Sequence, residues 1–147
     1  MEAPLADLSA FRITRKWPAQ DPGRIQLYSL PTPNGVGPMF GQVGFFHRFA
    51  GKDYEDKRPR DRYVAESRRL LEVLDARLAD RPWIMGEAYT IADMAIFPWV
   101  RNLVGFYGAG DLVRIADFPH VTRALNSFLS RPAVVQGVGI PSRARTS

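Results

Sequence analysis

The pattern of apolar and polar positions changes character near residue 37. Between residues 60 and 79, apolar side chains recur at spacings of three, four and seven, which is the period of one buried helix face. That stripe consists of Tyr63, Ser67, Leu70, Leu71, Leu74 and Leu78. Similar spacing predicts helices over residues 39–50 and 118–130. Residues 90–104 predict a helix that is apolar on every side and therefore central in the domain.

The first 38 residues follow a different pattern. They contain six prolines, which leave no room for a long helix. Alternating apolar residues over 25–30 predict one short strand, and residues 31–35 predict a turn. A lone strand needs a partner for its backbone groups. Three outcomes remain open for it: docking on the helices, disorder, or pairing with another chain.

Two signals mark helix starts. Thr90 and Asp93 are spaced as a capping box, in which each side chain accepts a hydrogen bond from the other residue's backbone N–H. Asp117 is the predicted cap of the last helix. Within the helix at 90–104, Pro98 predicts a kink. Gly41 and Gly44 weaken the helix at 39–50, unless they allow another backbone or a ligand to approach closely.

Composition narrows the function classes. The 147 residues correspond to about one domain, with a net charge of +5 and no cysteine. Thiolate metal sites and cysteine nucleophiles are therefore excluded, and the two histidines lack ligand spacing, so no metal is expected. The arginines are scattered among acidic residues, so no nucleic-acid partner is expected. We expect no membrane association, no secretory signal and a cytoplasmic location.

Three segments resemble the C-terminal domain of glutathione S-transferases, and in particular of nu-class bacterial enzymes. They are residues 37–42, residues 82–93, which include the capping box, and residues 131–134. The resemblance implies an all-α bundle of four to six helices. It implies a helical domain over residues 37–136 and a tail over 137–147. It also implies an N-terminal segment, 1–36, that holds a vestigial strand and turn.

Residues 25–35 resemble the first strand and catalytic turn of that family's thioredoxin-like domain. The resemblance implies that Thr32 and Asn34 contact glutathione and stabilise its thiolate, since hydrogen bonds to the charged form lower a thiol pKa. It also implies that one helix walls the acceptor-substrate pocket. The residues concerned are Met39, Phe40, Phe46 and His47. Ordinary core packing or an exposed interface would equally explain these four, and His47 suits a surface or capping role better than that of a base.

The chain departs from this family just after the turn. Asn34 is followed almost at once by the first helical motif, whereas a single βαβ unit alone takes about 30 residues. Most of the thioredoxin-like domain is therefore missing from this position. We expect a family member with glutathione as substrate and with thiol transfer or disulfide reduction that is weak or lost. The alternative is a non-catalytic helical association module, or an inactive deletion product, and a homodimer is possible.

Overall fold

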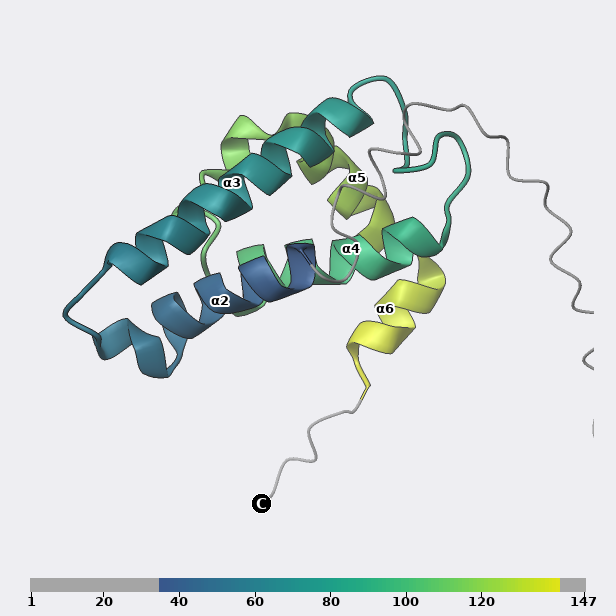
Figure 1. Cartoon of the computed structure of the whole chain (residues 1–147). Helices are drawn as coiled ribbons and strands as arrows, with labels where there is room; N and C mark the ends of the chain where they lie inside the picture. The colour runs from purple at the N-terminus through teal and green to yellow at the C-terminus, as the bar shows by residue number, and fades with distance from the viewer. Residues whose placement is uncertain (1–34, 141–147) are drawn as a thin grey trace, which may run out of the picture.

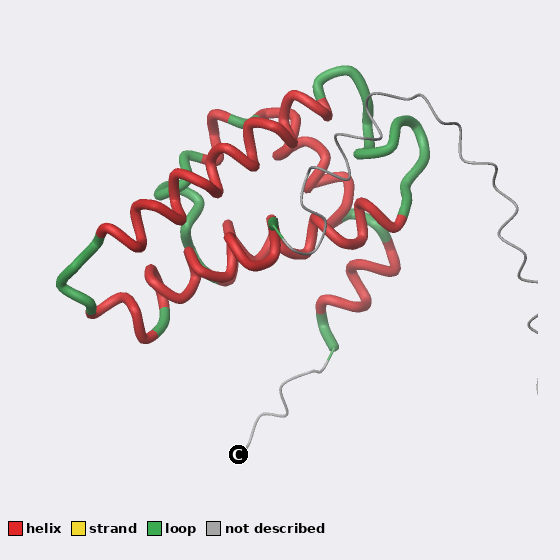
Figure 2. The backbone as a smooth tube through the Cα atoms, in the orientation of Figure 1, coloured by secondary structure: helices red, strands yellow, loops and turns green. Residues whose placement is uncertain are grey.

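The computed structural model describes residues 35–140, and every regular element in that range is helical (Figure 2). This confirms the predicted all-α class. The elements, in chain order, are α2 (Val36–Arg48), the 3-10 turn η2 (Ala50–Asp53), α3 (Arg58–Leu78), α4 (Ile91–Arg101), the π turn η3 (Asn102–Phe106), the 3-10 turn η4 (Ile115–Asp117), α5 (Pro119–Leu129) and α6 (Pro132–Val138). The predicted strand at 25–30, residues 31–34 of the turn predicted at 31–35, and residues 141–147 lie outside the described residues.

The bundle is built on α2 and α3, which run side by side and join through a short connection (Figure 1). Helix α4 packs on α2, and α5 packs on α3 and α4. Four helices therefore share one apolar core. Its largest fully buried side chains include Phe40, Leu70, Leu71, Leu78, Ile84, Phe97 and Leu103.

The predicted stripe on α3 is confirmed. Ser67, Leu70, Leu71, Leu74 and Leu78 are all buried, and Tyr63 is half-buried against the core. Helix α3 begins two residues before the predicted position, with Pro59 in its first turn, where a proline is tolerated.

Helix α4 differs from the prediction in its burial. Ile96, Phe97 and Val100 are buried, but Ile91 is 81% exposed and Met94 is 54% exposed. Ile91 and Met94 therefore form an apolar face of α4 that is exposed among the described residues. The sequence did not predict this exposure, because periodicity cannot show which apolar positions lack a packing partner.

Pro98 does not end α4. The helix continues to Arg101, and the backbone N–H of Asn102 donates to the carbonyl oxygens of both Pro98 and Trp99. The hydrogen-bond spacing then widens into η3, where the N–H of Tyr107 donates to the Asn102 carbonyl oxygen at 2.7 Å. The irregularity thus follows the proline as a π turn.

The predicted cap of the last long helix is wrong. Asp117 lies in η4, and the N-cap of α5 is Phe118, whose side chain makes no capping hydrogen bond. The cap comes instead from α3. Asp75 Oδ1 accepts from the N–H groups of His120, at 2.8 Å, and Val121, at 2.9 Å.

Helix α6 was not predicted from the sequence. It covers seven residues, of which none is buried, and Val134 is half-buried against the core. Figure 1 shows it in yellow at one end of the bundle. A helix without a buried face leaves no periodic signal to read.

Candidate functional site

Four candidate pocket residues lie on α2, where they fall on two faces. At about 100° per residue, Met39 and Phe46 lie within about 20° of each other, and so do Phe40 and His47. The two pairs are separated by roughly a quarter turn. Phe40 is only 1% exposed and lies in the core, whereas Met39 is half-buried against it.

Phe46, on the face that it shares with Met39, belongs to a cluster of aromatic rings at the end of α2 and the start of α3. Phe46 stacks on Tyr63, with ring centroids 5.7 Å apart. It meets Phe45 edge-on at 4.9 Å and Tyr54 at 6.0 Å. Tyr54 is 50% exposed, so this aromatic cluster (Phe45, Phe46, Tyr54 and Tyr63) reaches the surface. Such a surface suits an apolar or aromatic ligand.

His47 is directed elsewhere. Its Nε2 atom lies 3.3 Å from the carbonyl oxygen of Gly108, in the loop after η3. In the tautomer that carries its proton on Nε2, the ring donates to this carbonyl and ties α2 to that loop. The observed contact is therefore structural, and within residues 35–140 no carboxylate orients the ring as a base.

Arginines border the aromatic cluster. The Arg62 guanidinium lies 5.7 Å from the centroid of the Tyr63 ring. Farther along α3, a hydrogen bond from Arg69 holds the pKa of the Glu66 carboxyl below its usual value. In the connection before α3, hydrogen bonds from Arg58 lower the pKa of Asp56 in the same way. The charge of Arg62 also helps to lower the pKa of Glu66. Arg62 therefore places a cation against the Tyr63 side of the Phe46–Tyr63 stack.

A close helix approach holds α2 in place. A Cβ atom added at Gly44 would lie 2.7 Å from the Tyr107 ring, and one added at Gly37 would lie 2.9 Å from Trp99. Nothing lies within 4 Å at Gly41. The sequence left two roles open for Gly41 and Gly44, a weakened helix or a close approach. Gly44 allows close packing, whereas Gly41 only lowers helix propensity.

Two further features bear on function. Within residues 35–140, no group of three or more His, Asp or Glu side chains could hold a metal ion. No helix in that range is both long enough and apolar enough to cross a bilayer. Thr32 and Asn34 lie outside the described residues, so their predicted roles stay predictions.

Comparisons with known proteins identify the family of this helical bundle. Residues 57–126 match the family model for the glutathione S-transferase C-terminal domain. A glutathione transferase from Burkholderia graminis is 62% identical, with a TM-score of 0.76 over 86% of this chain and 53% of that one. The helical region of this chain belongs to the glutathione S-transferase family. This confirms the resemblance of the helical segments to the C-terminal domain of that family.

Other glutathione transferase relatives share the same region. A transferase from Pseudomonas putida is 60% identical, with a TM-score of 0.75 over 84% of this chain and 54% of that one. Disulfide-bond oxidoreductase YghU of Escherichia coli is 38% identical over 70% of this chain and 36% of its own length. The chain thus spans about half of the solved transferases and about a third of YghU. The Burkholderia structure holds two glutathione molecules per subunit, and the Pseudomonas structure holds one glutathione disulfide.

Sequence reasoning overlooked part of this site. It assigned Tyr63 to the core stripe and gave no role to Tyr54 or Arg62. A signal was available, because two antiparallel helices joined by a short connection place the end of one beside the start of the next. This geometry predicts that Phe46, near the end of α2, contacts the first turns of α3.

Proposed function

We propose that this chain is a glutathione-dependent enzyme of thiol transfer or disulfide reduction, with a rate far below that of its full-length relatives. The observation that carries the proposal is the Phe46–Tyr63 stack with Arg62 beside it, open to the surface at Tyr54. The stack suits the apolar part of a disulfide or acceptor, and Arg62 suits a glutathione carboxylate.

The chemistry follows from the lack of cysteine. Every thiol in the reaction belongs to glutathione or to its partner substrate. A glutathione thiolate attacks the disulfide of the acceptor, forms a mixed disulfide and releases one thiolate. A second glutathione thiolate then releases the other thiol and forms glutathione disulfide. The Thr32 hydroxyl and the Asn34 amide would donate hydrogen bonds to the attacking thiolate and lower its pKa.

The low rate follows from the position of α2. This helix begins at Val36, two residues after Asn34, so the chain places no other backbone between the turn and the bundle. A thiolate held only by side-chain donors loses orientation, and orientation contributes a large part of catalysis.

Turnover of 2-hydroxyethyl disulfide with glutathione tests the proposal. We expect measurable turnover, reduced about tenfold or more by Asn34→Ala, and a raised KM for glutathione in Arg62→Gln. Arg58→Gln is the matched control, because Arg58 is paired with Asp56 and 90% exposed. Unchanged turnover in Asn34→Ala contradicts the assigned role. If the unaltered chain shows neither turnover nor heat of glutathione binding, the enzymatic proposal is wrong.

A second candidate function is association through α4. Its observation is the open apolar face with Ile91 and Met94. Exposed apolar patches of this kind favour contact with another protein surface, here a second copy of the chain. We expect a concentration-dependent dimer in sedimentation equilibrium, lost in the Ile91→Lys, Met94→Lys double variant. Ala65→Lys, on the exposed side of α3, should leave the dimer intact.

A further inference from the structure

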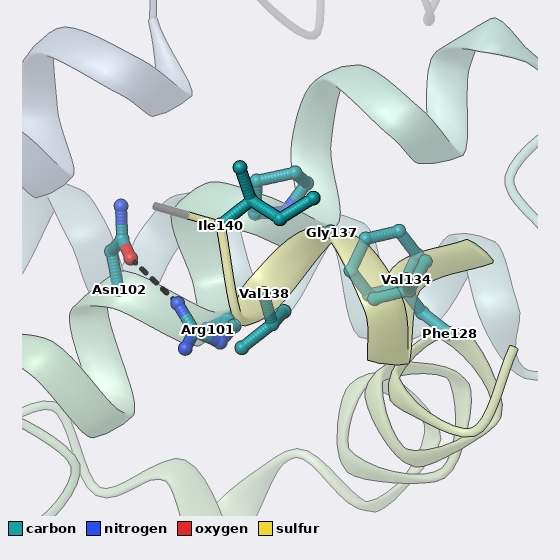
Figure 3. Close-up of a pocket in the computed structure, with 8 residues that line it drawn as sticks. Arg101, Asn102, Phe128, Val134, Gly137, Val138 and Ile140 are labelled. Carbon is teal, nitrogen blue, oxygen red and sulfur yellow. Dashed lines mark hydrogen bonds between the residues drawn. The ribbon is translucent and has the colours of Figure 1, made fainter. Parts of the chain in front are cut away.

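A hollow of about 400 Å³ opens where the end of α4 meets α5 and α6 (Figure 3). Its walls are mainly apolar, from Phe128 on α5 and Val134 and Val138 on α6, with Ile140 beyond them. Two polar residues, Arg101 and Asn102, lie at one side. The volume falls within the range of about 300–1,000 Å³ that small-molecule sites occupy, and a mostly apolar wall with few polar groups is typical of them.

Arg101 differs from its counterparts in its contacts. Its Nη1 atom donates to Asn102 Oδ1 at 3.5 Å, and within residues 35–140 it has no carboxylate partner (Figure 3). Every other arginine in that range contacts a carboxylate, a backbone carbonyl oxygen or an aromatic ring. Arg101 is also half-buried, so its charge is less well hydrated than that of an exposed arginine.

The surroundings of Arg101 extend the site. Arg101 and Asn102 also line a neighbouring hollow of about 490 Å³, with Gly105 and Phe106. Arg101 and Asn102 are therefore shared by the two hollows. A planar guanidinium of this kind binds a carboxylate through two parallel hydrogen bonds.

We propose that this hollow binds an alkyl monocarboxylate. The carboxylate accepts hydrogen bonds from the Arg101 guanidinium and the Asn102 side-chain amide. The alkyl chain lies along Phe128, Val134 and Val138. The single cation favours a ligand with one negative charge, and the apolar walls favour a ligand whose body is apolar.

Glutathione does not fit this description. It carries two carboxylates and an ammonium group, which the apolar wall could not solvate. None of the lining residues belongs to α2 or α3, so the site is separate from the aromatic cluster. The proposal therefore stands or falls independently of glutathione chemistry.

The test is a ¹H–¹⁵N NMR titration of the full chain with octanoate, and with octan-1-ol as the uncharged analogue. We expect octanoate to shift the amide signals of residues 98–102 and 134–140, with a dissociation constant in the millimolar range. Arg101→Gln should weaken octanoate about tenfold or more and leave octan-1-ol binding unchanged. Arg58→Gln removes the same charge elsewhere and should change neither.

A second variant tests the apolar wall. Val138 is 49% exposed, so Val138→Asp should leave the fold intact. It places a competing carboxylate near Arg101 and should weaken octanoate binding by a similar factor. Three results would overturn the proposal: no shift at these residues in about 10 mM octanoate, equal octanoate affinity in Arg101→Gln, or shifts confined to other helices.

Discussion

A single buried carboxylate joins the start of α4 to the segment before it. Asp93 is fully buried, and its Oδ2 atom accepts from the Thr90 N–H at 2.8 Å and the Thr90 hydroxyl at 3.2 Å. Its Oδ1 atom accepts from the Ile84 N–H at 3.0 Å. The capping box was predicted from spacing alone, but the bond to Ile84 was not, because it depends on how residues 79–90 fold back.

This arrangement predicts a ranking of stabilities. Asp93→Ala leaves the buried N–H of Ile84 without an acceptor as well as removing the cap, so we expect a loss of about 3 kcal/mol. Thr90→Ala removes the cap hydroxyl, which accepts from the Ala92 N–H at 3.3 Å and donates to Asp93 Oδ2 at 3.2 Å. It leaves the Thr90 N–H and the Ile84 N–H bound to Asp93, so it should cost about 1–2 kcal/mol. Urea unfolding followed by circular dichroism measures both losses. Equal losses in the two variants would contradict the role assigned to Ile84.

Two glycines on α2 offer a matched pair. Gly44→Ala forces a methyl group into the Tyr107 ring, so we expect a loss of about 1–3 kcal/mol. Gly41→Ala meets nothing within 4 Å and should stabilise the chain by about 0.5–1 kcal/mol through helix propensity. Thermal unfolding of both variants gives shifts of opposite sign. A stabilising Gly44→Ala would mean that α2 and the Tyr107 loop are not held together as described.

At the scale of the elements, α5 depends on α3 for its start. Asp75→Ala should cost about 1–2 kcal/mol, because two N–H groups of α5 lose their acceptor. Asp75→Asn keeps one oxygen acceptor and should cost less. Asp117→Ala should cost under about 1 kcal/mol, since Asp117 only forms partly exposed ion pairs with Arg68 and Arg114. If denaturant unfolding shows a larger loss for Asp117→Ala, the cap assignment is wrong.

Prediction from the sequence succeeded where a signal is local. The stripe on α3 and the box at Thr90 and Asp93 each lie within one element, and both are present in the structure. It failed where the partner is distant. Asp75 caps a helix 45 residues away. The sequence around Asp117 does not show that Asp75, rather than Asp117, caps α5. The candidate site divides in the same way, since Phe46 was identified but its partner Tyr63 was not.

At the scale of the whole molecule, the helices differ in how firmly they are held. Helices α2 to α5 contribute to one core, whereas α6 buries no residue. Hydrogen–deuterium exchange should therefore be fast in residues 132–138 and slow in residues 67–78. The expected cause is local opening of α6 at a free energy below that of global unfolding. Equal protection in the two segments would show that α6 is covered in solution.

The long-range hydrogen bonds between α3 and residues 113–123 have a kinetic consequence. Besides Asp75, Arg68 donates to the Val113 carbonyl oxygen at 2.7 Å and Arg123 donates to that of Leu78 at 2.6 Å, each across 45 residues of sequence. These contacts raise the contact order of a helical bundle that otherwise relies on local contacts. The slow step in reaching the native state then becomes closure of the long loop that contains α4. A chain newly leaving the ribosome would lack the first of these contacts until residue 113 has emerged, and the last until residue 123 has emerged.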